Sequence, residues 1–187
     1  MQLWPLSRGG AATDMRPLLA AHSELQIADL TPLPRFGLKG PGAAEWFSAQ
    51  GFDLPQVNRH ARQNGVTLLR LGGRDIMALA DPGAPENLSA FVSRWQAAPQ
   101  GHSSWREETW AWLRLTGPAA SDVMSRLTAF DIRETAFAAD AIAQTRVAQM
   151  DMVLLRTEAG FDLLFDIAST AQVIHDVDLA RAARARA

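Results

Sequence analysis

The sequence predicts an α+β fold that is built from two similar halves. Strand patterns alternate with helix patterns, hairpin signals lie inside each half, and one order of elements occurs twice. This arrangement is typical of split βαβ units with ferredoxin-like topology, which are expected to pack as one globule. The expected organisation is an irregular N-terminal arm over residues 1–34, a first half over 35–100 and a second half over 101–187.

The first half begins with an expected strand at residues 35–40. Pro41 follows it, and the first turn of a helix tolerates proline because the missing N–H would be unpaired there. Two apolar runs flank a glycine pair and predict a strand–turn–strand hairpin over 66–80. A second helix is predicted over 86–97, where apolar residues recur every three or four positions.

The second half repeats this order. Residues 109–115 alternate as a strand, and Gly117-Pro118 then opens a helix with an apolar face. Two further strands are expected at 148–156 and 161–167, before a last helix that starts near Ser169. Both halves therefore read strand, Gly-Pro, helix, strand, strand, helix.

Tryptophan is frequent in this chain, with 6 residues, and tyrosine is absent. Trp105, Trp110 and Trp112 are clustered, and large aromatic side chains are common both in cores and at the centres of interfaces. Core packing is one interpretation of the cluster. The other is that these three tryptophans, together with the N-terminal arm, dock a partner. Deletion of residues 1–30 is accordingly expected to leave a folded chain that assembles poorly.

Composition excludes several classes of protein. The net charge of −2 provides no basic surface for nucleic acid, and no apolar stretch is long enough to span a membrane. The chain has no cysteine, which removes disulfides, thiolate metal sites and cysteine nucleophiles. The N-terminus does not resemble a signal peptide, so a cytoplasmic location is expected.

No catalytic, cofactor-binding or metal-ligating residues are assigned from the sequence. The four histidines do not share a metal-ligand spacing, and no nucleotide-binding glycine motif or nucleophile elbow is found. Asp151 lies in a strongly apolar strand, so it is expected to be buried. Buried charges are normally paired, which favours an ion pair with Arg146 or Arg156 over contact with a ligand.

The order of motifs resembles the gamma subunit of heterotetrameric sarcosine oxidase. The likeness covers roughly residues 35–177, and the second half also resembles the folate-binding family that includes the glycine cleavage T-protein. The residues that carry it are Phe36 to Ala43, Leu54-Pro55, Asn58-Arg59, Leu69 to Gly72, Leu113 to Val123, Asp131-Ile132, Phe137, Ala143 to Ala148, Val153 to Arg156 and Phe161 to Phe165.

This resemblance implies an accessory subunit of a flavin-dependent oxidoreductase complex, with no catalytic residues of its own. Such a complex oxidises an N-methyl amine such as sarcosine and transfers the one-carbon unit to tetrahydrofolate. The resemblance places FAD, FMN, NAD and tetrahydrofolate on other chains. It implies larger flavoprotein and folate-handling alpha and beta subunits as partners, and a small zinc-binding delta subunit.

Three alternatives stay open at this stage. The small subunit of an N-methylglutamate dehydrogenase resembles the same family. A stand-alone tetrahydrofolate-binding protein is a second possibility, although the related factors carry a cysteine-containing motif and this chain has no cysteine. A structural module that self-associates through tryptophans is the third.

Overall fold

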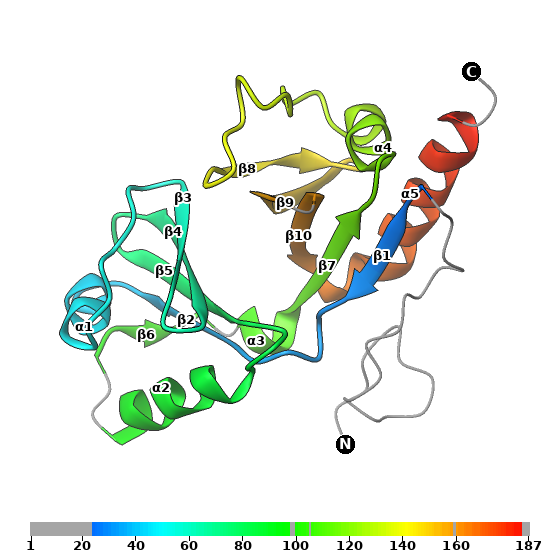
Figure 1. Cartoon of the computed structure of the whole chain (residues 1–187). Coiled ribbons are helices and arrows are strands. Elements are labelled where there is room, and N and C mark those ends of the chain that lie inside the picture. The colour runs from blue at the N-terminus through cyan, green and yellow to red at the C-terminus, as the bar shows by residue number, and fades with distance from the viewer. Residues whose placement is uncertain (1–23, 98–99, 105, 159, 185–187) are drawn as a thin grey trace. The chain divides into compact units, whose positions relative to one another are not determined.

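The computed structural model describes residues 24–97, 100–104, 106–158 and 160–184 (Figure 1). Helices accompany two five-stranded sheets in which neighbouring strands pair antiparallel. The α+β class that the sequence predicts is therefore confirmed. The chain divides into two compact units, one of Leu33–Thr109 and one that joins the chain up to Pro32 to the residues from Trp110 onward.

The Leu33–Thr109 unit has the sheet order β3-β4-β5-β2-β6. Its core is rich in aromatic side chains, among them Phe36 from the sheet, Phe47 from the first helix and Phe91 from the second. The elements are β2 (Arg35–Lys39), α1 (Ala43–Ala49), β3 (Arg59–Gln63), β4 (Val66–Gly72), β5 (Asp75–Ala80), α2 (Glu86–Ala97), β6 (His102–Ser103) and α3 (Arg106–Thr109).

The other unit has the sheet order β1-β7-β10-β9-β8. Alternating side chains of the sheet pack with the apolar faces of α4 and α5 to form its core. The elements are β1 (Gln26–Asp29), β7 (Trp110–Thr116), α4 (Ala120–Leu127), β8 (Ile142–Val147), β9 (Met150–Thr157), β10 (Gly160–Asp166), a 3₁₀ turn (Ile167–Ser169) and α5 (Thr170–Arg184).

The predicted internal repeat is present in both units. The series β2, α1, β3, β4, β5, α2 corresponds in order and in sheet position to β7, α4, β8, β9, β10, α5. Each copy contains one strand more than the sequence predicts, β3 and β8. The strand β3 has the sequence RHARQ, in which polar residues dominate, so it lacks the apolar alternation by which an exposed edge strand could be recognised.

The fifth strand of each sheet comes from an unexpected place in the chain. The strand β1 precedes the first repeat but pairs with β7 of the second, and β6 precedes the second repeat but pairs with β2 of the first. The prediction of an irregular arm is thus wrong for residues 26–29. Leu25, Ile27 and Leu30 are at most 3% exposed, and Leu25 and Ile27 belong to the core under the sheet. Deletion of residues 1–30 would remove this strand, so a truncation that tests docking has to end at residue 23.

An ion pair joins α3 to the sheet of the Leu33–Thr109 unit. The guanidinium of Arg106 donates to both carboxylate oxygens of Asp75, at 2.6 and 2.8 Å, and Lys39 Nζ lies 3.2 Å from the same carboxylate. Burial raises the pKa of Asp75, but the hydrogen bonds and charges of Arg106 and Lys39 outweigh it, so the pKa lies below its usual value of 3.8.

We therefore expect Asp75 to stabilise the fold in a pH-dependent way. A carboxylate whose pKa is lowered by folding contributes stability above its unfolded pKa and loses it as the pH falls through the folded pKa. The difference in unfolding free energy between the natural chain and Asp75→Asn should be about 2 kcal/mol at pH 7 and shrink below about pH 4. Urea unfolding between pH 7 and 3 measures it. A difference that grows on acidification would contradict the assignment.

Candidate functional site

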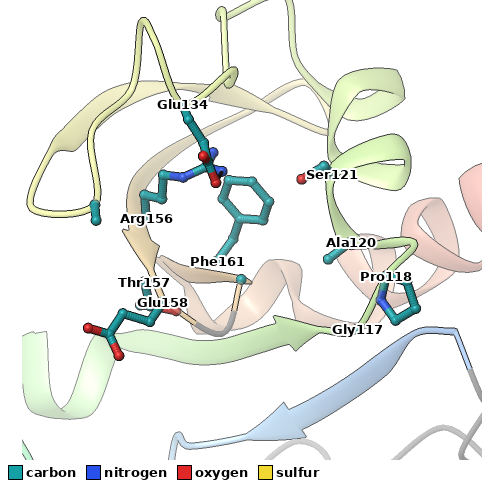
Figure 2. Close-up of a pocket in the computed structure, with 11 residues that line it drawn as sticks. Gly117, Pro118, Ala120, Ser121, Glu134, Arg156, Thr157, Glu158 and Phe161 are labelled. Carbon is teal, nitrogen blue, oxygen red and sulfur yellow. Dashed lines mark hydrogen bonds and ion pairs between the residues drawn. The ribbon is translucent and has the colours of Figure 1, made fainter.

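A pocket of about 580 Å³ lies in the unit that contains α4 and β10 (Figure 2). Three segments that are distant in sequence form its walls: the Gly-Pro turn with the start of α4, the loop between α4 and β8, and the β9–β10 hairpin. The lining residues are Gly117, Pro118, Ala120, Ser121, Glu134, Ala139, Arg156, Thr157, Glu158, Gly160 and Phe161.

Arg156 and Phe161 form one side of the pocket. The guanidinium carbon of Arg156 lies 5.3 Å from the centroid of the Phe161 ring, a separation at which a cation and an aromatic face attract. Arg156 also donates to the Ile132 carbonyl at 2.6 Å and to Glu134 Oε1 at 2.9 Å. Its side chain is 12% exposed, so it anchors the loop between α4 and β8 to the sheet.

Two glycines in the pocket lining make close backbone contacts. Gly117 has φ +104°, and a Cβ there would lie 2.6 Å from the carbonyl oxygen of Glu24. Gly160 has φ +149°, and a Cβ there would lie 2.1 Å from the carbonyl oxygen of Leu115. Only glycine allows the backbone to approach this closely, so the two contacts fix the course of the chain at Gly117 and Gly160, which both line the pocket.

The charges of the pocket favour a cation over an anion. Its lining holds the two carboxylates of Glu134 and Glu158 against the one guanidinium of Arg156, which makes −2 + 1 = −1. Arg156 donates to Glu134 and to the Ile132 carbonyl, so its charge is already partly balanced within the chain. The start of α4 lies at the wall, but Asp122 in its first turn balances the positive end of that helix.

Among the described residues that line the pocket, there is no histidine, cysteine or lysine. The hydroxyls of Ser121 and Thr157 are therefore not accompanied by a general base of the kind that activates a serine or threonine nucleophile. Within the described residues, no group of His, Cys, Asp or Glu side chains could hold a metal ion. Among the same residues, no helix combines the length and hydropathy that crossing a membrane requires.

The three tryptophans proposed for docking differ in their placement. Trp105 lies outside the described residues, and Trp110 is half-buried at the start of β7. Trp112 is 1% exposed, so its ring offers no surface to a partner. Its indole Nε1–H donates to Asp162 Oδ2 at 3.0 Å, and Arg114 donates to the same carboxylate at 2.6 and 2.7 Å. Docking through tryptophan thus stays a proposal for Trp110 alone among the described residues.

The prediction that Asp151 is buried is wrong. Its side chain is 97% exposed, and it lies 3.9 Å from Arg146 Nε, one of the two partners that the sequence suggests. Asp151 is the second residue of β9, next to the β8–β9 turn. At this margin of the sheet its side chain points to solvent. Arg156, the other suggested partner, belongs to the pocket instead.

Sequence reasoning missed the pocket because its residues come from three separate segments. One signal was available: Arg156 ends the apolar run of β9, and a long cationic side chain beside such a run requires an acceptor. The acceptors, Glu134 and the Ile132 carbonyl, lie in a loop that has no periodic pattern.

No family model and no curated protein matches the sequence. Among solved structures, the fold is similar to that of a chain of heterotetrameric sarcosine oxidase from Corynebacterium sp. U-96, with a TM-score of 0.68 and 23% identity. It is also similar to glycine cleavage system aminomethyltransferase T from Bartonella henselae, with a TM-score of 0.55 and 16% identity. The resemblance noted in the sequence is thereby confirmed at the level of the fold.

The coverage of the two matches differs. The first spans 87% of this chain and 86% of the sarcosine oxidase chain, so these two chains have nearly the same length. The second spans 80% of this chain but only 44% of the aminomethyltransferase. This chain is therefore comparable in size to one whole chain of the heterotetramer, and to less than half of the transferase.

Proposed function

We propose that this chain is a non-catalytic, gamma-type subunit of a sarcosine-oxidase-like complex that oxidises an N-methyl amine and handles tetrahydrofolate. The observation that carries the proposal is the fold match, which extends over nearly the whole length of both chains. A match of this extent to a chain of similar size favours the role of one complete subunit. The motif order over residues 35–177 supports the same family.

The chemistry of the described residues fits an accessory role. Among the described residues that line the pocket, none is histidine, cysteine or lysine, and the one guanidinium is held by Glu134 and the Ile132 carbonyl. FAD, FMN, NAD and tetrahydrofolate are proposed to lie on the larger alpha and beta subunits, and the small delta subunit is proposed to bind zinc. The complex is proposed to work in the cytoplasm.

Co-expression with the neighbouring reading frames tests this proposal. We expect a tagged form of this chain to co-purify with a large flavin-containing subunit in fixed stoichiometry. The complex should produce peroxide or reduce an acceptor when an N-methyl amine is added. Elution of the chain as a stable monomer that retains no flavoprotein would contradict the proposal.

The small subunit of an N-methylglutamate dehydrogenase is a variant of the same proposal. The amine would be bound by another chain, so no residue of this one distinguishes the two. Flavin reduction in the complete complex, measured with sarcosine and with N-methylglutamate in parallel, separates them by the amine that is turned over.

A stand-alone tetrahydrofolate-binding protein is a second candidate, favoured by the fold shared with the aminomethyltransferase. Its pocket would have to accept the carboxylates of folate, and the net charge of the lining opposes this. Calorimetric titration of the isolated chain with tetrahydrofolate decides between the two. Saturable heat at micromolar ligand would support this second function.

The N-terminal segment provides a test of docking that spares the fold. Removal of residues 1–23 leaves β1 and the buried Leu25 intact, so we expect the unfolding free energy to change by less than about 1 kcal/mol. We expect the same truncation to weaken assembly at least tenfold, because the docking proposal assigns part of the contact with the partner to these residues. Assembly at the affinity of the full chain would show that these residues do not dock.

A further inference from the structure

We infer that the pocket beside α4 receives a basic side chain, lysine or arginine, from the subunit on which this chain docks. The inference deepens the proposed function and rests on it, since it identifies the surface and the chemistry by which the accessory chain would be held. The expected occupant of the pocket is a positively charged side chain of the partner subunit, and not an anionic small molecule.

The shape of the pocket suits a side chain that is apolar along its length and charged at its end. Pro118, Ala120 and Ala139 line it with aliphatic groups, against which the methylene stem of a lysine or arginine packs. Its volume of about 580 Å³ admits such a side chain with part of the loop that carries it. Figure 2 shows the Phe161 ring between the Arg156–Glu134 pair and Ser121.

The charges at the rim suit the end of that side chain. Glu158 is exposed on the β9–β10 turn, and within the described part of the chain no cation is paired with it. Glu134 is also reachable, because its side chain is 85% exposed although one oxygen accepts from Arg156. A cation that enters the pocket would offset the net negative charge of its lining. Charge complementarity of this kind selects a partner and its orientation.

Two serines of α4 allow the occupancy of the pocket to be measured. The chain contains no cysteine, so a single introduced thiol can be followed without interference. Ser121 lines the pocket, whereas Ser125, one helical turn later, is exposed outside the lining. In the isolated chain, the thiols introduced by Ser121→Cys and Ser125→Cys should react with N-ethylmaleimide at similar rates.

In the assembled complex, we expect alkylation of the Ser121→Cys thiol to slow at least tenfold while that of the Ser125→Cys thiol changes less than twofold. The mass of this subunit gives both rates. Equal reactivity of the Ser121→Cys thiol in the complex and in the isolated chain would overturn the inference and leave the proposed function standing. Absence of any complex with a flavoprotein subunit would overturn both.

Substitutions that change the charge of the pocket identify the sign of the charge that the partner side chain carries. We expect Glu158→Lys to weaken binding to the partner subunit at least tenfold and Glu158→Gln about two- to fivefold. Asp151→Lys, a reversal at an exposed carboxylate of β9 outside the pocket, should change it less than twofold. Unchanged or tighter binding of Glu158→Lys would overturn the inference. Thermal unfolding monitored by circular dichroism should be the same for all three variants, since both carboxylates lie at the surface.

Discussion

Replacement of Asp162 by alanine is expected to lower the unfolding free energy by about 3–5 kcal/mol. Asp162 is 2% exposed and accepts hydrogen bonds from Trp112 and Arg114, its neighbours across the strand pair β10–β7. The hydrogen bonds to Asp162 raise the pKa of Arg114 against its burial, so this guanidinium stays charged. Without the carboxylate, the charge and the indole N–H would both be left without an acceptor. Urea unfolding with linear extrapolation measures the loss.

A matched double variant tests whether the loss of unfolding free energy comes from the charge of Arg114 that is left without its partner. Replacement of both partners by apolar residues of similar size, in Arg114→Met with Asp162→Leu, removes the charge together with its acceptor. We expect this double variant to recover at least about 1 kcal/mol relative to Asp162→Ala. A value for Asp162→Ala within 1 kcal/mol of the natural chain would show that the cluster contributes little.

The same cluster shows where sequence patterns predict the fold well and where they do not. The strand β7 alternates, so Leu113 faces the core while Trp112 and Arg114 share the opposite face of the sheet, and the sequence predicts this strand. Which acid is buried depends on cross-strand register. Asp162 lies opposite Arg114, whereas Asp151 lies at the sheet margin next to a turn. Register is set by tertiary pairing, which a single strand does not reveal.

The edge strands β1 and β6 were not predicted for a related reason. Each pairs with a strand that is distant in the chain, as when Ile27 lies opposite Leu115. Their local sequences are short and lie near proline or glycine, so nothing in them marks a strand. The Gly-Pro turns were predicted because their signal is local: Gly40 and Gly117 have positive φ, and each helix begins two residues after the proline of its turn.

The candidate site was the least predictable part of the molecule. The sequence assigned no catalytic, cofactor-binding or metal-ligating residue, and one of the tryptophans proposed for docking, Trp112, is in the interior. The pocket arises where the α4 start, a loop without periodicity and a hairpin turn meet. Such a meeting depends on the assembled sheet and not on any one segment, so it can be recognised only once β7, β9 and β10 are paired.

Gly160→Ala is the substitution expected to damage both the fold and this pocket. The new Cβ would lie 2.1 Å from the Leu115 carbonyl oxygen and 3.2 Å from Thr116 Cα. Both are backbone atoms, so no side-chain rotation relieves the overlap, and β10 would have to separate from β7 where the pocket floor forms. We expect a loss of about 3 kcal/mol or more in unfolding free energy, measured by urea unfolding, with weaker assembly as a consequence.

Gly73→Ala provides the control for that experiment. Gly73 lies in the turn between β4 and β5, has an ordinary φ, and has no atom within 4 Å of the position of an added Cβ. Its substitution should therefore change the unfolding free energy by no more than about 0.5 kcal/mol. Equal effects of the two substitutions would mean that loss of glycine as such, and not the contact with Leu115, is responsible. A large effect confined to Gly160 would show that the stability of this unit depends on the close approach of the β10 backbone to the Leu115 carbonyl.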